Sequence, residues 1–389
     1  MPWKETRVVD QRVQFIAWLR QEEQETGRSN VARACKRFGI SRDTGYKWLA
    51  RYEAQGPAGL EDRKPVPGRC PHRVVDEVEG QVVELRKQWP HYGPKKLRAL
   101  LVESGLLGVP AASTIGDILD RNGLLRPRRR RVRVPPSGSP LAHAQQPNDV
   151  WCVDFKGHFG LGNGQRCYPL TITDATSRYL IKCESVLQPD ESHCRPHFER
   201  AFREFGIPSR IRSDNGPPFA TKSPGGLSRL SVWWVQLGIE PERIEPGQPQ
   251  QNGRHERFHL TLKQQTASPP KADAAEQQRA FDRFRHEYND QRPHEALGQT
   301  PPARHYEPSL RPMPEPRPPQ YDPDVMVRWV ATGGTICVKG FVLYVGTVLG
   351  KQPVGLRQTD EDEWELFYGP LLLGYVLVRK GEARLEPLR

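Results

Sequence analysis

Three acidic residues of this sequence stand where a carboxylate could take part in chemistry. Asp154 interrupts an otherwise apolar, strand-like run, where a lone buried carboxylate is costly unless something pairs with it. Asp214 follows a short strand-like segment, and Glu256 lies near the start of a helical one. Carboxylate oxygens are the ligands that Mg²⁺ and Mn²⁺ prefer. Two such ions can activate a water or a 3′-hydroxyl and stabilise the leaving oxygen, so these residues predict metal-dependent phosphoryl transfer.

The elements that must position these carboxylates begin at residue 149. The pattern predicts a meander of three strands, followed by a helix, a strand, a helix, a strand and two further helices. The predicted ranges are 150–159, 168–173, 179–186, 190–205, 210–213, 228–237, 239–244, 250–265 and 275–288. This order predicts an α/β domain in which a mixed five-stranded sheet carries helices on its faces. Asp214 would then lie at the carboxyl end of a strand, where open α/β sheets place their ligands.

Six motifs follow one another in this region, and their order is more specific than any one of them. They are Trp151-x-x-Asp154, Thr173-Asp-Ala-Thr-Ser-Arg178, Phe205-Gly-Ile-Pro208, Ser213-Asp-Asn-Gly216-Pro-Pro-Phe219, Pro249-Gln-Gln-Asn-Gly253-Arg-His-Glu256-Arg257 and Tyr288-Asn-x-x-Arg292-Pro293-His294-x-x-Leu297. With these motifs, residues 149–308 resemble the catalytic core of the retroviral-integrase-like transposases, the DDE group with an RNase H-like core. The resemblance implies that Asp154, Asp214 and Glu256 are the catalytic and metal-binding triad, with two Mg²⁺ or Mn²⁺ ions per active site.

The sequence departs from the family pattern in one spacing. Between Asp214 and Glu256 lie 41 residues, more than the family usually has, and we place the surplus in the Gly/Pro-rich loop 221–228. A loop there should leave the carboxylates where they are. Three other glutamates are alternatives to Glu256, but two of them lie within the strand predicted at 239–244 and the third directly follows it: Glu240, Glu242 and Glu245.

The N-terminal residues 1–55 predict a helix-turn-helix module. Helical spacing covers 8–21, 30–38 and 41–52; Gly39 suits the end of one helix, and Ser41 suits the N-cap of the next. The last helix would enter the major groove with its early residues. Its predicted DNA contacts are Arg42, Thr44 and Lys47, with Asp43 beside them. The alternative is an ordinary helical hairpin.

A linker at 56–73 precedes a second module at 74–125. Helices are predicted at 75–87, 94–103 and 113–122, with Pro94 in a first turn and Ser113 as an N-cap. The segment Tyr92–Leu97 resembles part of a winged helix-turn-helix. Within it, Lys95 and Lys96 are predicted to contact DNA.

Two further basic groups are predicted to contact DNA. An arginine-rich linker spans 126–148, and six of its first eight residues are arginine. Such a run repels itself and will not pack, so we expect Arg128, Arg129, Arg130 and Arg131 to bind phosphates or a minor groove. On the predicted helix with Glu256, the other basic contacts are Arg254, Arg257 and Lys263. The alternative for these residues is a solvated surface.

The C-terminal part differs in character from the rest. A Pro-rich linker at 309–324 leads to residues 325–389, where short strands alternate with Gly turns. That pattern predicts a small all-β, SH3-like barrel. The chain is thus expected to be multidomain: all-α helix-turn-helix modules, a central α/β core of RNase H-like type, and a C-terminal β-barrel.

The charge distribution indicates a polyanionic partner. The formal net charge is +12, and residues 1–135 hold 27 Lys and Arg against 16 Asp and Glu, while the remainder is nearly balanced. This is the pattern of a nucleic-acid-binding arm on a near-neutral body. Seven cysteines without a CxxC pair, and the lack of a long apolar run, predict a reduced protein of the cytoplasm. The resemblance to transposases implies that it is bacterial and nucleoid-associated.

Together these features predict a DNA transposase or integrase that binds the ends of an insertion sequence and catalyses strand cleavage and strand transfer. Its partners would be double-stranded DNA, as terminal inverted repeats and target, and further copies of itself; no membrane and no nucleotide cofactor are expected. The main alternative is a catalytically silent DNA-binding regulator derived from a transposase. A structure-specific nuclease is less suited, because a nuclease core needs neither the N-terminal modules nor the β domain.

Overall fold

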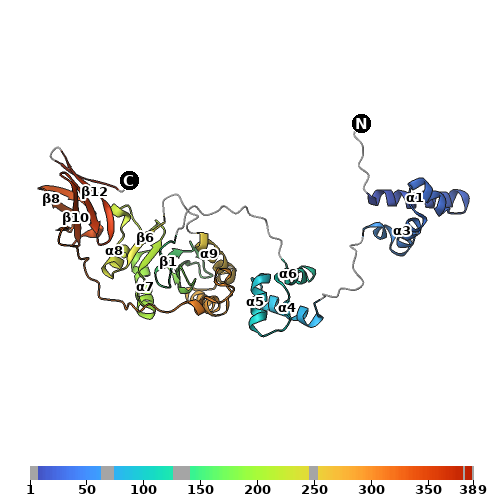
Figure 1. The fold of residues 1–389 in the computed structure, drawn as a ribbon, viewed down its shortest axis with the longest axis horizontal. Helices are drawn as coiled ribbons and strands as arrows, with labels where there is room; N and C mark the ends of the chain where they lie inside the picture. Colours follow the sequence, from blue (N-terminus) through green and yellow to red (C-terminus); the bar gives the residue numbers. More distant parts are fainter. Residues whose placement is uncertain (1–7, 63–73, 126–140, 245–252, 380–381, 388–389) are drawn as a thin grey trace. The chain divides into compact units, whose positions relative to one another are not determined.

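The computed structural model describes residues 8–62, 74–125, 141–244, 253–379 and 382–387 (Figure 1). The chain divides into two compact units, 1–74 and 75–389. In the described residues, no helix is long and apolar enough to cross a membrane.

The first unit consists of three helices and one 3₁₀ turn. Helices α1 (Val8–Thr26), α2 (Val31–Phe38) and α3 (Arg42–Gln55) are followed by η1 (Gly56–Leu60). Gly39 adopts a left-handed conformation between α2 and α3, and the Ser41 side chain accepts a hydrogen bond from Thr44 N. Both signals were predicted and are confirmed. Trp48 and Leu60 are buried in the core of this unit, which therefore extends five residues beyond the predicted boundary.

Residues 74–125 form a second helical module. It contains α4 (Asp76–Gln88), α5 (Pro94–Glu103) and α6 (Ala112–Arg121). The predicted N-cap at Ser113 is wrong, because α6 starts one residue earlier and its N-cap position, Ala111, has no side-chain cap. The predicted wing is also wrong for these residues, since 74–125 include no strand.

The central domain is built on a mixed sheet. Its strands are β1 (Val150–Phe155), β2 (Phe159–Gly160), β3 (Arg166–Asp174), β4 (Leu180–Val186), β5 (Arg210–Ser213) and β6 (Glu240–Arg243). The order runs from β2 and β4, which both pair with β3, through β1 and β5 to β6. Strand β1 pairs antiparallel with β3 and parallel with β5. The five predicted strands are present, and the first predicted one is interrupted at 156–158, which adds the short β2.

Helices cover both faces of this sheet. On one face, α7 (Glu191–Phe205) and α8 (Arg229–Gln236) pack on strand residues such as Trp151 and Ile211. Trp233 and Trp234 are buried there, as expected of core residues. On the other face, α9 (Gly253–Thr266) and α10 (Ala274–His286) pack on Leu180 and other strand residues.

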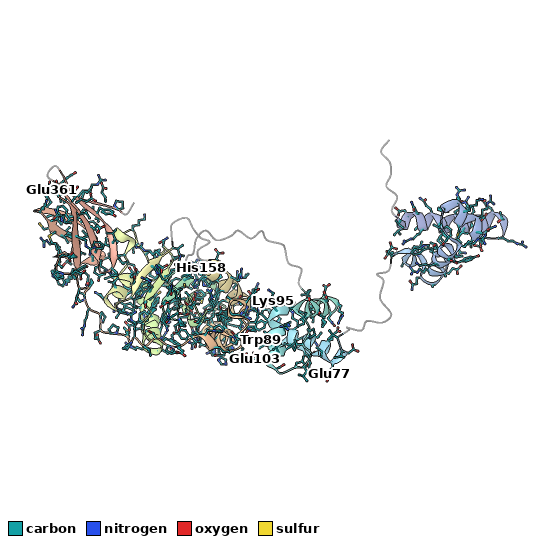
Figure 2. All side chains as sticks on the ribbon, viewed as in Figure 1. Glu77, Trp89, Lys95, Glu103, His158 and Glu361 are labelled. Carbon is teal, nitrogen blue, oxygen red and sulfur yellow. The ribbon has the colours of Figure 1, made fainter. Side chains whose placement is uncertain are left out.

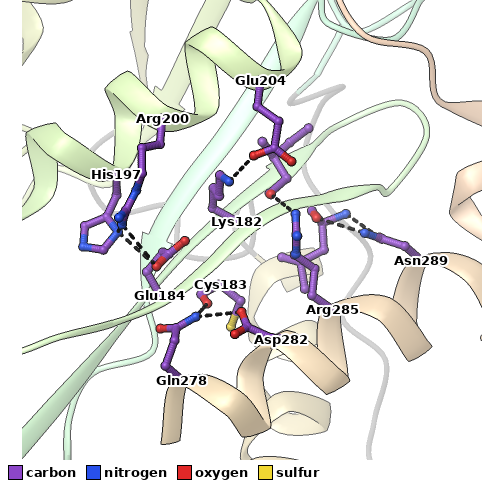
Figure 3. A network of polar contacts seen from close by, with 12 residues as sticks. Lys182, Cys183, Glu184, His197, Arg200, Glu204, Gln278, Asp282, Arg285 and Asn289 are labelled. Atoms are coloured by element: carbon purple, nitrogen blue, oxygen red, sulfur yellow. Dashed lines mark hydrogen bonds and ion pairs between the residues drawn. The ribbon is translucent and has the colours of Figure 1, made fainter. Parts of the chain in front are cut away.

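Strand β4 pairs with β3 along one edge, and side chains bond backbone groups along its other edge (Figure 3). Gln278 of α10 donates to Cys183 O and accepts from Ser185 N. Asn289, in the π-helical turn η4 (Glu287–Gln291), accepts from Leu180 N and donates to Leu180 O. These contacts hold α10 against the sheet and cover an edge that could otherwise pair with another chain.

The Pro-rich segment after the core packs along it. It follows the short 3₁₀ helices η5 (Glu295–Leu297) and η6 (Pro302–His305). Ser309 N donates to Phe205 O, and Ile207 N donates to Arg311 O. Gly206 has φ +71, and a Cβ there would lie 2.4 Å from Ser309 O. Part of the predicted linker 309–324 is therefore fixed to the core by backbone hydrogen bonds.

The C-terminal residues are all-β, as predicted. Strands β7 (Met326–Trp329), β10 (Pro353–Asp360), β11 (Glu363–Tyr368), β12 (Leu371–Arg379) and β13 (Glu382–Glu386) form an antiparallel sheet in the order β13-β12-β11-β10-β7. Strands β8 (Thr335–Val338) and β9 (Phe341–Tyr344) form a hairpin, and a 3₁₀ turn, η7 (Thr347–Leu349), follows it. The strand pairings give a five-stranded sheet and a hairpin.

Candidate active site

Asp154 and Asp214 come from neighbouring parallel strands. The register of β1 and β5 pairs Val150 with Arg210 and Cys152 with Arg212. Continuing that register by two residues places Asp154 beside Asp214, on the same side of the sheet. Neighbouring strands are about 4.8 Å apart, so the two carboxylates can share ligands at the carboxyl ends of β1 and β5.

The two aspartates are held by different local contacts. Thr171, opposite Asp154 on β3, donates from Oγ1 to Asp154 O at 3.0 Å. Asp214 Oδ1 accepts from Gly216 N at 3.3 Å. Burial raises the pKa of Asp214, and the Gly216 hydrogen bond offsets this only in part. Asn215 donates to Ile244 O at 2.8 Å, which ties this turn to the residue that follows β6.

Glu256 lies on α9, whose packing on the sheet involves two histidines. His255 and His259 are buried, whereas Glu256 between them is exposed. His255 Nε2 is 3.4 Å from Thr173 Oγ1, and His259 Nε2 is 2.9 Å from Thr171 Oγ1. Thr171 and Thr173 face the same side of the sheet as Asp154, so α9 lies over the face that carries the two aspartates.

Both histidines are neutral at physiological pH. Burial lowers the pKa of His255 to about 4. Burial, together with His255 and Lys156, lowers the pKa of His259 to about 2. His259 Nδ1 lies 3.9 Å from Asp154 Oδ2, and because the ring is uncharged this contact is not an ion pair.

Two of the three glutamates that competed with Glu256 form ion pairs elsewhere. Glu240 is 2.9 Å from Arg210, and Glu242 is 3.2 Å from Arg212. Both pairs join β6 to β5, where they reinforce the sheet. Glu245 lies outside the described residues.

The described residues contain no group of three His, Cys, Asp or Glu side chains already close enough to hold one metal ion. Asp154 and Asp214, at the ends of two paired strands, would supply two hard oxygen ligands, and Glu256, on a helix over the same face, would supply a third. A cavity of about 60 Å³ lies next to them, lined in part by Cys152, Thr173 and His255. The chemistry of this ligand set fits Mg²⁺ or Mn²⁺.

The predicted DNA contacts are found in several environments. Arg42 and Lys47 are exposed on α3, while the Thr44 hydroxyl lies 2.8 Å from Ser41 Oγ at the helix cap. Arg257 and Lys263 are exposed on α9. The side chains of Arg254 and of Arg128–Arg131 lie outside the described residues.

Lys95 and Lys96 lie where α5 meets the core, a contact that the sequence did not predict (Figure 2 labels Lys95). Lys95 Nζ is 2.6 Å from Glu295 Oε1, and Tyr92 OH donates to Glu287 Oε1 at 3.2 Å. Burial and the nearby Arg292 lower the pKa of Lys96 to about 7.

Sequence analysis also missed His259 and Thr171 as residues that touch the candidate site. A signal was present, because histidines four apart on a helix and threonines two apart on a strand each share one face. Only the structure shows that the histidine face of α9 packs on the threonine face of β3.

Four family models match the chain. Two models described as "Integrase core domain" match residues 144–249 and 237–302. A model described as "Helix-turn-helix domain" matches residues 11–69, and one described as "Homeodomain-like domain" matches residues 44–119.

Proteins of bacterial insertion elements are similar to the chain. The "Insertion element IS407 uncharacterized 31.7 kDa protein" of Burkholderia multivorans is 26% identical over 273 residues, which is 70% of this chain and 88% of that protein. A corresponding IS476 protein of Xanthomonas euvesicatoria is 28% identical, covering 69% of this chain and 76% of its own length. "Transposase InsD" of insertion element IS2 from Escherichia coli is 28% identical, covering 59% and 78%.

Solved structures with a likeness to this chain include two of retroviral proteins. The HTLV-2 integrase catalytic core domain in complex with magnesium is 16% identical, covers 42% of this chain and 99% of its own, and has a TM-score of 0.33. A simian T-cell lymphotropic virus intasome is 18% identical, covers 75% and 97%, and has a TM-score of 0.38.

Proposed function

Because the chain contains an integrase core domain and helix-turn-helix domains, and has insertion-element transposases among its homologues, we propose that it is an active DDE-type transposase. It would bind the ends of an insertion sequence, cleave a DNA strand there by hydrolysis and join the resulting 3′-hydroxyl to target DNA. Its partners would be the terminal inverted repeats, the target duplex and further copies of itself.

The observation that carries this proposal is the parallel register of β1 and β5. Continued by two residues, this register would put Asp154 and Asp214 beside one another at the ends of the two strands, and burial raises the pKa of the half-buried Asp214 carboxylate. A buried carboxylate with a raised pKa gains stability when a cation lies beside it. A core with no catalytic role would gain nothing from this arrangement.

Each residue of the triad has a distinct role in the proposed reaction. Asp154, Asp214 and Glu256 would hold two Mg²⁺ or Mn²⁺ ions, which activate the attacking oxygen and stabilise the leaving one. Thr171 fixes the backbone of Asp154, and Gly216 N fixes the carboxylate of Asp214. The exposed Glu256 would complete the ligand set from the side on which DNA arrives.

DNA contacts are proposed for exposed basic residues on two helices. Arg42 and Lys47 on α3 would contact the terminal repeat, with Thr44 at the start of the same helix. Lys263 lies two helical turns beyond Glu256 and on the same side of α9, so it would contact the phosphates that flank the reacting one. Arg254, Arg257 and Arg128–Arg131 are proposed to bind phosphates as well.

The domain boundaries given by the sequence are proposed with one change. The helix-turn-helix unit would end at residue 60 instead of 55, because Leu60 is buried in it. The second module (74–125), the core (149–308) and the β domain (325–389) keep their predicted limits.

The test is a cleavage and strand-transfer assay on labelled DNA from the flanks of the gene. Wild type and Asp154→Asn would be compared in Mg²⁺ and in Mn²⁺, with end binding measured separately. We expect products from wild type alone and similar end binding by both proteins. End binding without product from either protein would favour the DNA-binding regulator, and product from Asp154→Asn would refute the assignment of Asp154.

A further inference from the structure

His259 lies between the candidate catalytic carboxylate and the strand next to it. Its side chain is 6% exposed. Nε2 is 2.9 Å from Thr171 Oγ1, and Nδ1 is 3.9 Å from Asp154 Oδ2. Thr171 in turn donates to the backbone oxygen of Asp154. His259 is thus linked to the main chain of Asp154 through Thr171, and at 3.9 Å its ring lies near the Asp154 carboxylate without a hydrogen bond to it.

The same arrangement recurs one helical turn earlier. His255 Nε2 is 3.4 Å from Thr173 Oγ1, and Thr173 lies opposite Cys152 on β1. Four residues of helix rise about 6 Å, and two residues of strand span about 6.6 Å, so the two histidines match the two threonines. Sliding α9 along the sheet by a residue would break both contacts. The pairs therefore fix the register of α9 on the sheet.

This register determines where Glu256 stands. Glu256 precedes His259 by three residues, and residues three apart on a helix are neighbours on its surface. The imidazole therefore reaches Asp154 from a helical position adjacent to that of Glu256. Any movement of His259 would change the separation of Asp154 from Glu256.

We propose that His259 is a positioning residue of the metal site, which acts through Thr171 to hold the helix of Glu256 at the separation from Asp154 that metal binding requires. The proposal rests on the proposed function. It extends the site to a side chain outside the three carboxylates. Changes to residues that orient metal ligands typically reduce metal affinity or activity by about 10- to 100-fold.

Three replacements of His259 separate positioning from simple packing. Asn places its amide near the Nδ1 position and so keeps a polar group facing Asp154. Gln places its amide near Nε2 and keeps the contact with Thr171. Leu fills the space without either contact. His286, exposed at the end of α10, supplies a matched control as His286→Asn.

The experiment measures Mn²⁺ binding by the full chain, using electron paramagnetic resonance, together with the Mn²⁺ dependence of cleavage. We expect His259→Leu to weaken Mn²⁺ binding by about tenfold or more and to lower kcat, with end binding unchanged. His259→Gln should recover most of the affinity, whereas His259→Asn and Thr171→Val should lose part of it. His286→Asn should match wild type.

The outcomes distinguish this inference from the proposed function. If His259→Leu binds Mn²⁺ like wild type and only melts earlier, the residue is a packing residue and the inference is wrong. If His259→Leu does not fold, equal Mn²⁺ affinity in the Asn and Gln variants and wild type refutes the inference. If wild type binds Mn²⁺ through Asp154 and His259 but cleaves no DNA, the positioning role stands and the proposed function fails. A wild-type chain that binds no Mn²⁺, with or without DNA, refutes both.

Discussion

At the scale of single residues, ionisation of Asp214 costs the folded chain stability. Burial raises the pKa of Asp214, so its charged form is less favourable in the fold than in the unfolded chain. The resulting penalty is fully present above the raised pKa and is relieved as the pH falls through it. We expect Asp214→Asn to raise the melting temperature of the chelator-treated protein while abolishing cleavage, as scanning calorimetry and the cleavage assay would measure.

Glu256→Gln is the control for that substitution. Glu256 is exposed, so its removal should end cleavage without raising the melting temperature. Added Mn²⁺ should stabilise wild type, because a ligand that binds only the folded state increases stability. A melting temperature for Asp214→Asn at or below that of wild type in the presence of chelator would contradict the argument.

The candidate site shows how far residue types alone could lead. Asp154 was singled out because it is polar in an apolar strand, and Asp214 because it ends one. Both signals come from neighbouring residues in the sequence. The carboxyl ends of the two strands lie at the same edge of the sheet. His259 and Thr171 carry no local signal of this kind, since a histidine on an amphipathic helix is usually a core residue. Their contact depends on the fold of residues 88 positions apart.

At the scale of elements, the helices were predicted best where a side chain caps them. Ser41 and Asp190 both accept a hydrogen bond from the helix they begin, and α3 and α7 start directly after them. The structure of a segment was predicted less well where contacts with residues distant in the sequence determine it. Leu60 follows a Gly/Pro-rich stretch typical of linkers, yet α1 buries it, with Arg12 donating to its carbonyl. The segment around Ser309 and Arg311 likewise owes its place to the backbone of the core.

The close approach of α2 and α3 gives a prediction for the first helix-turn-helix unit. A Cβ on Gly45 would lie 2.3 Å from Cys35 Sγ and 3.2 Å from Phe15. Overpacking of this kind costs about 1–3 kcal/mol, more than the about 1 kcal/mol that alanine adds to helix propensity. We expect Gly45→Ala to speed hydrogen exchange across residues 31–55 and to weaken binding of the terminal repeat.

Gly80 of α4 provides the matched control, because a Cβ there meets no atom within 4 Å. Gly80→Ala should stabilise its helix by about 0.5–1 kcal/mol and leave terminal-repeat binding as it is. Faster exchange in both variants, or in neither, would show that the contact between α2 and α3 does not set the stability of this unit.

At the scale of the whole molecule, the contact between α5 and the core places Lys96 near side chains of both charges. Lys96 lies within the influence of Arg292, Glu295 and Glu287, and burial and Arg292 lower its pKa from 10.5 to about 7. Its ammonium lies 5.5 Å from the centre of the Tyr92 ring. Below pH 7 the folded chain must therefore hold a charge there that the unfolded chain keeps in water.

That imbalance makes the stability of the contact depend on pH. The unfolded chain binds the proton of Lys96 more tightly than the folded one, so stability should rise with pH between about 7 and 10.5. Replacing Lys96 by Met removes the penalty, and the melting temperature of Lys96→Met should exceed that of wild type most at and below about pH 7. The difference should shrink as the pH rises toward 10.5 and disappear above it, because wild-type Lys96 is neutral in both states only there.

Lys95→Met is the control for Lys96→Met. It tests whether the effect requires a buried lysine or only a lysine at the contact between α5 and the core. Lys95 is exposed and pairs with Glu295, so its replacement should give no gain at any pH. The salt dependence of end binding tests whether Lys96 also contacts DNA. If the core releases Lys96 so that it can bind a phosphate, the affinity of Lys96→Met for DNA ends will depend less steeply on salt concentration than that of wild type. If the contact persists on DNA, the salt slope will not change, and Lys96 will act as part of a fixed joint that sets the second helical module against the core. A melting-temperature difference between Lys96→Met and wild type that did not vary with pH would refute the burial of a charge at this joint.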